Sequence, residues 1–260
     1  MDLTHAVAIV TGSSSGIGAA IARQLSAKGC KVTINYSHNE EGARAVADEC
    51  GALGGQILLQ RADVSQDDEC RSLVEDTLKQ FGRLDILVNN AGTTKFCLHQ
   101  NLGGLSRSDF LDIYAVNLIG PFQMTRAAEA AMRRQPVAHI VNMASIAALT
   151  GVGSSIAYAA SKGALVTMTM SLARVLGPQI RVNAICPGFV EGEWLKKGLG
   201  EERYESIRSQ YAQISPLKAT ATPETVAHTV LALVGGGDWT TGETIIVDGG
   251  AHLHTAPLRR

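Results

Sequence analysis

The chain has 260 residues, of which 45% are hydrophobic and 18% charged, and its formal net charge at pH 7 is −1. This length and apolar content suit one large domain with a sizeable core, and no proline-, glycine- or charge-rich linker divides the chain. The near-zero charge gives no electrostatic basis for binding nucleic acid or an anionic membrane, so we expect neither as a partner.

Several absences favour a cytoplasmic location. No apolar run approaches the ~20 residues of a membrane-spanning helix. The first strand pattern starts near residue 6, which leaves no room for a signal peptide. The five cysteines are scattered and lack C-x-x-C spacing, as in a reducing compartment. None of the seven histidines clusters with them, so no metal site is expected.

Strand and helix patterns alternate almost to the end of the chain. Strands are predicted at 6–11, 31–36, 57–62, 84–89, 138–144, 180–185 and 244–247. Helices are predicted at 16–28, 40–51, 67–81, 107–132, 156–176 and 223–234. The alternation predicts an α/β fold, a single doubly wound Rossmann domain over 1–260 with a seven-stranded parallel sheet and helices on both faces. Ligands of such folds bind at the carboxyl ends of the strands.

The first strand pattern runs directly into T-G-S-S-S-G-I-G and then into a helical pattern. Glycines at this spacing permit a tight turn, close approach of the backbone to a ligand, and close packing of the helix on the sheet. The helix N-terminus then faces an anion, usually a pyrophosphate. A glycine-rich surface loop is the alternative, but the strand before and the helix after favour a dinucleotide site. Its predicted residues are Gly12, Ser14, Ser15, Gly16, Ile17 and Gly18.

The end of the second strand bears on the choice of nucleotide. Enzymes that prefer NAD usually place Asp or Glu there to bind the ribose 2′-hydroxyl, whereas this chain has Tyr36, Ser37 and His38. No acid is present to repel a 2′-phosphate, and Ser37, His38 and the amides opening the next helix are able to accept one. No Arg or Lys stands in this loop or at Ser15. We therefore expect NADP(H) to be favoured, with NAD(H) as the alternative.

Two further strand ends supply candidate nucleotide contacts. Asp63 and Val64 follow the third strand, from which a carboxylate can reach an adenine amino group. Capping of the helix at 67–81 is an almost equal alternative for Asp63. Asn90, Ala91 and Gly92 close the fourth strand with small or polar side chains that suit a cofactor wall.

The reactive groups gather in the stretch 140–162. Ser145 ends the fifth strand, while Tyr158 and Lys162 lie four residues apart on an otherwise apolar helix and therefore share a face. A free phenol has a pKa near 10 and is a poor acid–base catalyst at neutral pH. A nearby ammonium and the positive charge of an oxidised nicotinamide would lower the pKa of Tyr158, and Ser145 would hold the substrate oxygen.

The one long interruption of the alternation, at 187–222, is predicted to be a substrate lid. It is rich in charge and also carries large apolar side chains, among them Trp194, Leu195 and Leu199. A long segment with its own amphipathic helices is usually functional. Pro187, Gly188 and Val190 at its start are expected to contact the cofactor.

Together these residues resemble the short-chain dehydrogenase/reductase family over about residues 5–253. The matching motifs are Thr11-Gly12-x-x-x-Gly16-x-Gly18, Asp63, Asn89-Asn90-Ala91-Gly92, Asn117-Leu118-Ile119-Gly120, Ser145, Tyr158-x-x-x-Lys162 and Pro187-Gly188. The resemblance implies a catalytic tetrad of Asn117, Ser145, Tyr158 and Lys162. In this tetrad Tyr158 is the acid/base, Lys162 also binds the nicotinamide ribose, and Asn117 holds a water that passes protons. It also implies a homo-oligomer, a tetramer or a dimer, built through the helices 107–132 and 156–176 and the last strand.

Within the family, Asn35-Tyr36-Ser37 and the V-D-G-G ending are similar to 3-oxoacyl-carrier-protein reductases. Two features depart from the pattern. Many relatives have a threonine that touches the nicotinamide amide where this chain has Gly192. The two arginines with which those reductases dock the acidic carrier correspond to Pro136 and to a position near Gln179, with Arg133, Arg134 and Arg181 nearby.

The sequence thus predicts an NAD(P)(H)-dependent oxidoreductase that interconverts a ketone and a secondary alcohol, a small-molecule substrate. Within that class a 3-oxoacyl thioester reductase competes with a dehydrogenase of sugars, polyols or other small alcohols. A nucleotide-binding sensor or scaffold without catalysis is the alternative from a different class, although such proteins usually lose the tyrosine or lysine that this chain keeps.

Overall fold

The computed structural model describes residues 1–237 and 239–254 and has one sheet of seven parallel strands. The strands are β1 (Val7–Val10), β2 (Lys31–Tyr36), β3 (Ile57–Arg61), β4 (Ile86–Asn89), β5 (Ala138–Met143), β6 (Ile180–Pro187) and β7 (Thr244–Val247). Their order is β3-β2-β1-β4-β5-β6-β7. The predicted doubly wound α/β fold is confirmed, while residue 238 and residues 255–260 of the predicted domain lie outside the described part.

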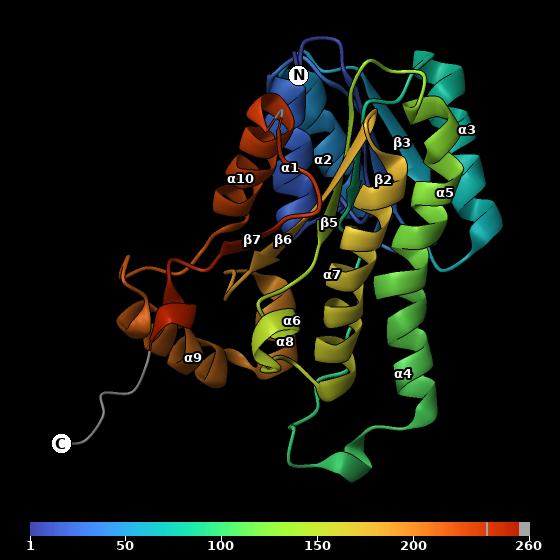
Figure 1. The fold of residues 1–260 in the computed structure, drawn as a ribbon. Helices are drawn as coiled ribbons and strands as arrows, with labels where there is room; N and C mark the ends of the chain where they lie inside the picture. Colours follow the sequence, from blue (N-terminus) through green and yellow to red (C-terminus); the bar gives the residue numbers. More distant parts are fainter. Residues whose placement is uncertain (238, 255–260) are drawn as a thin grey trace.

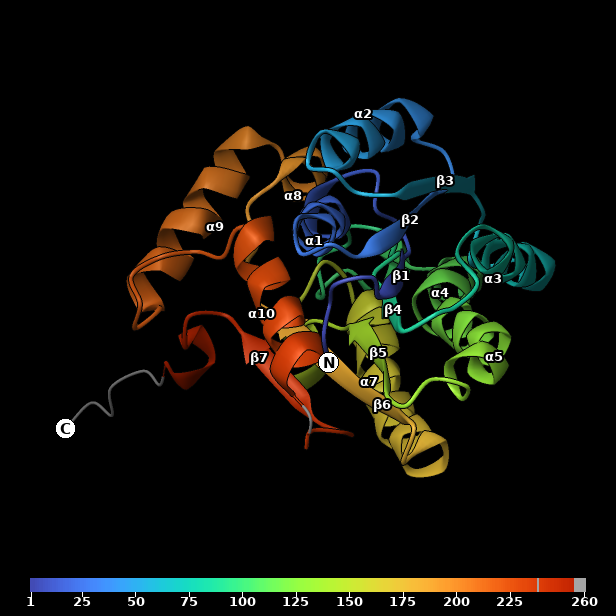
Figure 2. The same ribbon diagram turned by 90° about the horizontal axis from the view of Figure 1, so that it is seen from above.

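Helices cover both faces of the sheet (Figures 1 and 2). One face carries α1 (Gly16–Ala27), α2 (Glu40–Ala52) and α10 (Pro223–Gly236). The other carries α3 (Asp67–Phe81), α5 (Gly120–Met132) and α7 (Ile156–Leu176). The remaining α-helices are α4 (Arg107–Tyr114), α6 (Ala147–Thr150), α8 (Glu193–Leu199) and α9 (Glu201–Ile214).

Alternation along each strand divides the core into two layers. In β1, Ala8 and Val10 pack with α1, α2 and α10, whereas Val7 and Ile9 pack with α3, α5 and α7. All four are buried because both faces of the sheet are covered, which is why the strand reads as a continuous apolar run. Each fully buried aliphatic side chain contributes about 1.5–3 kcal/mol of transfer free energy to folding.

The helix predicted at 107–132 is not uniform. α4 starts at a capping box of Ser106 and Asp109, but a π-helical segment, Ala115–Ile119, separates it from α5. The prediction of a single α-helix is therefore corrected. A π turn takes in an extra residue, and such turns occur frequently at functional sites. Asn117 lies within the segment and is fully buried.

The segment predicted as a lid does contain helices of its own, α8 and α9, which lie with α6 at one end of the molecule (Figure 1). Its two ends are joined by a parallel bridge between Val190 and Ala221. Phe189 packs against Tyr204 and Tyr211 of α9, with ring centroids 5.3 and 5.6 Å apart. The base of the segment is therefore closed on itself by contacts between its two ends and α9.

Candidate functional site

The carboxyl ends of the parallel strands bring the predicted site residues to one edge of the sheet. The glycine turn follows β1, Asn90 to Gly92 follow β4, Ser145 follows β5, and Pro187 ends β6. β1 lies between β2 and β4, and β5 lies between β4 and β6, so these four ends are neighbours. This is the edge at which ligands of doubly wound sheets bind.

Two glycines of the turn are required by close packing. Gly12 has φ +61°, and a Cβ there would lie 2.9 Å from the Cα of Ala91. A Cβ at Gly18 would lie 2.5 Å from the Nδ2 of Asn90 and from the carbonyl oxygen of Gly12. The start of α1 is therefore pressed against the turn and against the loop after β4, as predicted for helix–sheet packing at this motif.

The third glycine faces open space. Gly16 has φ +54°, a left-handed conformation that favours glycine, and a Cβ at this position would have no other atom within 4 Å. Ser15 precedes α1 without a side-chain cap, and the first turn of α1 contains no acid. The opening amides of α1 and the space beside Gly16 fit a diphosphate, whose charge the helix N-terminus would stabilise. Ser14 and Ile17 lie in the same turn.

The second helix begins beside this turn. Asn39 caps α2, because its Oδ1 accepts a hydrogen bond of 3.1 Å from the amide of Gly42. A Cβ at Gly42 would lie 2.7 Å from the carbonyl oxygen of Ser14. The N-terminus of α2 therefore packs on the glycine turn, close to where a nucleotide ribose would follow a bound diphosphate.

Two polar residues for which the sequence predicts no separate role hold the turn in place. Asn35 Oδ1 accepts from the amide of Gly12 at 3.0 Å, and its Nδ2 donates to the carbonyl of Ala62 at 2.9 Å. Thr11 Oγ1 accepts from the amides of Asn90 and Ala91 at 2.9 and 3.0 Å. Their positions at strand ends, directly before predicted contacts, are the sequence signal that could have identified them.

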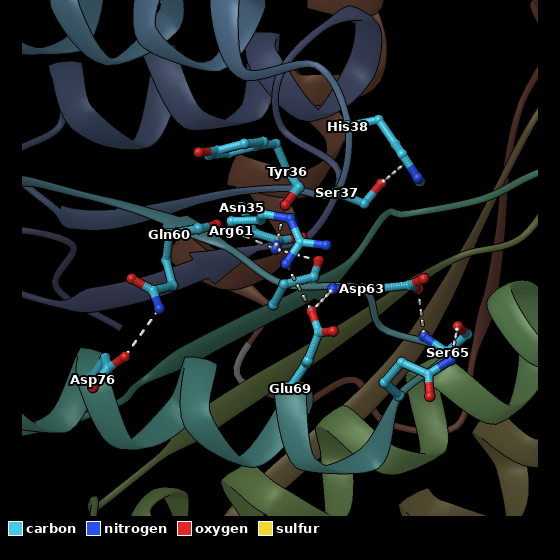
Figure 3. Close-up of polar contacts among 12 residues, drawn as sticks. Asn35, Tyr36, Ser37, His38, Gln60, Arg61, Asp63, Ser65, Glu69 and Asp76 are labelled. Carbon is cyan, nitrogen blue, oxygen red and sulfur yellow. Dashed lines mark hydrogen bonds and ion pairs between the residues drawn. The ribbon is translucent and has the colours of Figure 1, made fainter.

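The loop after β2 divides its side chains between core and surface. The Tyr36 ring is buried in the core formed with α1 and α2, whereas Ser37 and His38 lie outside it and hydrogen-bond each other, with 2.9 Å between Ser37 Oγ and His38 Nδ1 (Figure 3). Because the Tyr36 ring is buried in the core, only the main chain of Tyr36 faces the proposed cofactor site. As nucleotide contacts, all three residues remain predictions.

Asp63 forms a turn after β3 rather than a helix cap. Its Oδ1 accepts from the amide of Ser65 at 2.9 Å, and its own amide donates to Glu69 Oε2 at 2.7 Å. The cap position of α3 is occupied by Gln66, so the capping alternative for Asp63 is wrong. Val64 is buried, and its carbonyl accepts from Gln123 Nε2 at 2.9 Å.

Lys162 and Asn117 meet below the loop after β4. Lys162 is buried, and its ammonium donates to the carbonyl of Met143 at the end of β5 at 2.7 Å. Asn117 Oδ1 accepts from the amide of Thr93 at 2.8 Å. A Cβ at Gly92 would lie 3.4 Å from Asn117 Oδ1 and 3.6 Å from Lys162 Nζ. Glycine at this position therefore leaves open the space between the two polar groups.

The first turn of α7 positions Tyr158. Ser155 caps this helix, and its Oγ accepts from the amide of Tyr158 at 3.2 Å. The Tyr158 ring centroid lies 5.7 Å from Lys162 Nζ, and the Ser145 side chain is near enough to the phenol to lower its pKa. The predicted catalytic side chains of Ser145 and Lys162 thus both lie near the Tyr158 side chain.

Burial dominates the titration of both groups. It raises the pKa of Tyr158 to about 12, although the nearby Ser145 hydroxyl acts in the opposite direction. Burial also lowers the pKa of Lys162 to about 8. The expected lowering of the Tyr158 pKa is therefore not achieved by these residues alone, because desolvation of the phenolate outweighs the neighbouring polar groups. The positive charge of an oxidised nicotinamide is the further contribution that the expectation included.

The start of the lid is tied to the strand ends. The carbonyl of Pro187 accepts from the amide of Ile146, next to Ser145, at 2.9 Å. Gly188 packs so closely on the residue after β7 that a Cβ would lie 2.5 Å from the Cβ of Asp248. Val190 pairs with Ala221 across the base of the lid.

Gly192, where the family resemblance leads us to expect a threonine, is the residue that precedes α8 and has φ +152°. This conformation favours glycine, so the backbone gives a physical reason for the departure. The amide of Gly192 donates to the phenol of Tyr204 at 3.3 Å.

Aromatic side chains cover the mouth of the site. Trp194 of α8 lies 6.2 Å from Tyr158 and 5.7 Å from Phe96, measured between ring centroids. Phe96 belongs to the loop after β4, so this contact joins the lid to the opposite wall. Phe96 was missed in the sequence because an isolated aromatic residue in a loop gives no periodic signal.

The described residues contain no helix long and apolar enough to cross a membrane. Across residues 1–237 and 239–254, no group of three or more His, Cys, Asp or Glu side chains could hold a metal ion.

Comparisons with known proteins agree with this geometry. A family model described as "Enoyl-(Acyl carrier protein) reductase" matches residues 12–252. A Streptomyces violaceoruber protein named "Granaticin polyketide synthase putative ketoacyl reductase 2" is 40% identical over 247 residues, 95% of this chain and 96% of the relative. The 3-oxoacyl-[acyl-carrier-protein] reductase of Synechocystis is 36% identical over 252 residues, 95% of this chain and 97% of the relative.

A solved structure named "putative short-chain dehydrogenase/reductase from Burkholderia xenovorans" has a TM-score of 0.89 and 38% identity, and the match covers 96% of this chain and 99% of that one. The matched residues include the glycine turn, the Tyr158–Lys162 helix and the lid. The chain belongs to the short-chain dehydrogenase/reductase family and is an NAD(P)-dependent oxidoreductase that acts on CH–OH or keto groups.

Proposed function

We propose that the protein interconverts a ketone and a secondary alcohol, with Tyr158 as the acid/base. The observation that carries the proposal is that the Tyr158 ring lies 5.7 Å from the buried Lys162 ammonium, with Ser145 near enough to the phenol to lower its pKa. The two hydroxyl groups are near enough to each other that both could donate to a single oxygen of the substrate. A bound reduced nicotinamide would supply the hydride to the carbonyl carbon.

Each of the four residues has a distinct task in this reaction. Ser145 holds the carbonyl oxygen, and Tyr158 donates its phenolic proton to that oxygen as the alcohol forms. Lys162 favours the resulting phenolate electrostatically. Asn117 is buried and hydrogen-bonded to the main chain of Thr93. It lines the path by which a proton returns to Tyr158. In the oxidation direction the same groups move the proton the opposite way.

The nucleotide is NADP(H) in preference to NAD(H). The loop after β2 has Ser37 and His38 and no acid where NAD-binding enzymes usually place one. The uncapped start of α1 and the open space at Gly16 support binding of its diphosphate. In Asp63, Oδ1 accepts the hydrogen bond of the turn from Ser65. The other carboxylate oxygen, Oδ2, could then accept from the adenine amino group.

The substrate we favour is a 3-oxoacyl thioester. Two relatives carry names that describe ketoacyl or 3-oxoacyl reduction, and the aromatic mouth formed by Trp194 and Phe96 suits a partly apolar chain. The family model carries the description of an enoyl reductase, which reduces a carbon–carbon double bond. The paired hydroxyls of Ser145 and Tyr158 are better suited to a carbonyl oxygen than to an alkene carbon.

A free ketone, sugar or polyol is the second candidate, and the positions of the arginines favour it over a protein-bound substrate. Arg133 and Arg134 follow α5, and Arg181 lies near the start of β6. These positions are at the amino edge of the sheet, whereas Ser145 lies at the carboxyl edge. Within one protomer they are therefore not beside the proposed catalytic groups.

We further propose that the protein is a homo-oligomer, a tetramer or a dimer. The outer surface of α5 and α7 supports this, because a hollow of about 380 Å³ there has a mainly apolar lining. Ile119 and Phe122 are exposed on it. Light scattering of the purified protein would give the mass of the assembly.

The test compares the wild type with Tyr158→Phe. We expect the wild type to oxidise NADPH in the presence of an acetoacetyl thioester and the variant to lose turnover by at least about 10²-fold, with nearly unchanged nucleotide affinity. Full activity of the variant would overturn the mechanism. Turnover with small ketones but not with the thioester would favour the second candidate.

A further inference from the structure

A basic side chain from β3 lies beside the proposed nucleotide site. The sequence shows no Arg or Lys in the loop after β2 or at Ser15. In the sheet, however, Arg61 is paired with Tyr36, although the two residues are 25 positions apart. Neighbouring parallel strands lie about 4.8 Å apart, so the parallel register brings Arg61 directly to the end of β2.

The guanidinium of Arg61 projects across the ends of the strands. Figure 3 shows it between the loop of Ser37 and His38 on one side and Asp63 on the other. These are the two positions predicted to flank the ribose and the adenine. The side chain of Arg61 is 61% exposed, so a bound ligand can reach it.

Arg61 has unused capacity to donate. Within residues 1–237 and 239–254, its side chain has one ion-pair partner, Glu69, with 3.8 Å between Nη1 and Oε2. That distance is too long for a good hydrogen bond, and the same oxygen already accepts from the amide of Asp63. A guanidinium has five N–H donors in a planar fork that matches phosphate oxygens.

We propose that Arg61 recognises the 2′-phosphate of NADP(H) and is the residue that sets the nucleotide preference of this chain. Ser37 assists, because its hydroxyl can turn from His38 to donate to the same phosphate. The carboxylate of Glu69, 3.8 Å from the guanidinium, would compete with the phosphate for it. This inference rests on the proposed use of NADP(H) and names the residue responsible for it.

The experiment measures equilibrium dissociation constants by calorimetry for NADPH, NADH, 2′,5′-ADP and 5′-ADP. We expect Arg61→Gln to weaken NADPH and 2′,5′-ADP by about 10- to 100-fold, the loss typical of a charge-assisted contact. NADH and 5′-ADP, which have no 2′-phosphate, are expected to bind as before. The matched control is Arg71→Gln, which removes an exposed, ion-paired arginine of α3 that points to Asp67.

Glu69→Gln gives a change in the opposite direction. The amide oxygen of glutamine can still accept from Asp63, while the negative charge beside Arg61 is removed. We expect NADPH to bind a few-fold more tightly to this variant and NADH to be unaffected.

Each outcome separates this inference from the proposed function. An equal loss of NADPH and NADH affinity in Arg61→Gln would mean that Arg61 contacts the adenine or the diphosphate, and would overturn the assignment. Unchanged affinities for both nucleotides would mean that Arg61 contacts neither, and would overturn it too. In both cases the proposed reaction survives as long as the wild type turns over, whereas a wild type that binds neither nucleotide would contradict the proposed function itself.

Discussion

The two sides of the site are built differently. On the nucleotide side, the turn after β1, the end of β2 and the loop after β4 are joined by hydrogen bonds of Asn35 and Thr11 and by glycine contacts too close for any side chain. On the substrate side, the lid meets the opposite wall through the aromatic contacts of Trp194, which is 48% exposed. A hydrogen-bonded frame for the proposed cofactor therefore faces a lid that is held by exposed apolar contacts.

The difference matches what each side must do. Hydride transfer requires the nucleotide to be held within tenths of an ångström, and a network of buried hydrogen bonds provides that precision. Substrates must enter and leave, so the lid relies on exposed apolar contacts that cost little to separate. Substitutions on the nucleotide side should consequently abolish function, whereas those on the lid should adjust it.

The largest effect is expected at Lys162. Lys162→Met keeps most of the side-chain volume but removes the ammonium beside Tyr158, and we expect kcat to fall by about 10²- to 10⁴-fold. Steady-state kinetics with NADPH and the preferred ketone measure this. Lys79→Met on the surface of α3 is the control, since Lys79 is 74% exposed and distant from the strand ends. Near-normal kcat in Lys162→Met would remove the electrostatic role assigned to the ammonium.

Gly18→Ala should be next in effect. The added methyl would lie 2.5 Å from the Gly12 carbonyl and from Asn90, and overpacking of this kind costs about 1–3 kcal/mol. We expect a lower unfolding free energy in urea and loss of nucleotide binding. Gly51→Ala provides the contrast, because nothing lies within 4 Å of its added methyl within α2 and about 0.5–1 kcal/mol of stabilisation is expected. If Gly18→Ala bound nucleotide normally, the nucleotide side of the site would be as tolerant of substitution as we expect the lid to be.

The ionisation of Tyr158 tests the electrostatics of the site. Burial raises its pKa to about 12, above the ordinary value of 10, so the folded state holds this proton more tightly than the unfolded state does. The contribution of Tyr158 to stability is therefore complete below pH 10 and is lost as the pH rises towards 12.

Phenolate absorbance near 295 nm, as the difference between wild type and Tyr158→Phe, reports this ionisation. Without nucleotide we expect no signal from Tyr158 below about pH 11, and addition of NADP⁺ should move the titration to lower pH. A midpoint near 10 in the free protein would mean that burial does not control this phenol.

The sequence predicted the strands, the two-faced arrangement of helices and the edge that carries the site, because apolar periodicity and glycine spacing depend only on local order. It missed the π-helical segment around Asn117, since one extra residue in a turn leaves no mark in the apolar pattern. It also missed Arg61 as a neighbour of Tyr36, because strand order and register join residues that are remote in sequence.

The raised pKa of Tyr158 was unpredictable for a related reason. A Tyr-x-x-x-Lys spacing indicates that two groups share a helix face, but it does not indicate how deeply the surrounding loops bury them. Gly192 is a similar case. The sequence showed only that threonine was absent, and the backbone angle gave the reason.

The smallest effect should come from the lid. Trp194→Ala removes the ring that covers Tyr158 and contacts Phe96. Because this ring is half exposed and makes no hydrogen bond to the nucleotide frame, we expect KM for an apolar ketone to rise about three- to ten-fold, as for loss of about 1 kcal/mol of apolar contact. The dissociation constant of NADPH should be unchanged. Trp194→Phe, which keeps an aromatic face, should recover most of the KM. If Trp194→Ala instead lowered NADPH affinity as strongly as a substitution in the glycine turn, the lid would belong to the cofactor frame, and the two sides of the site would be one.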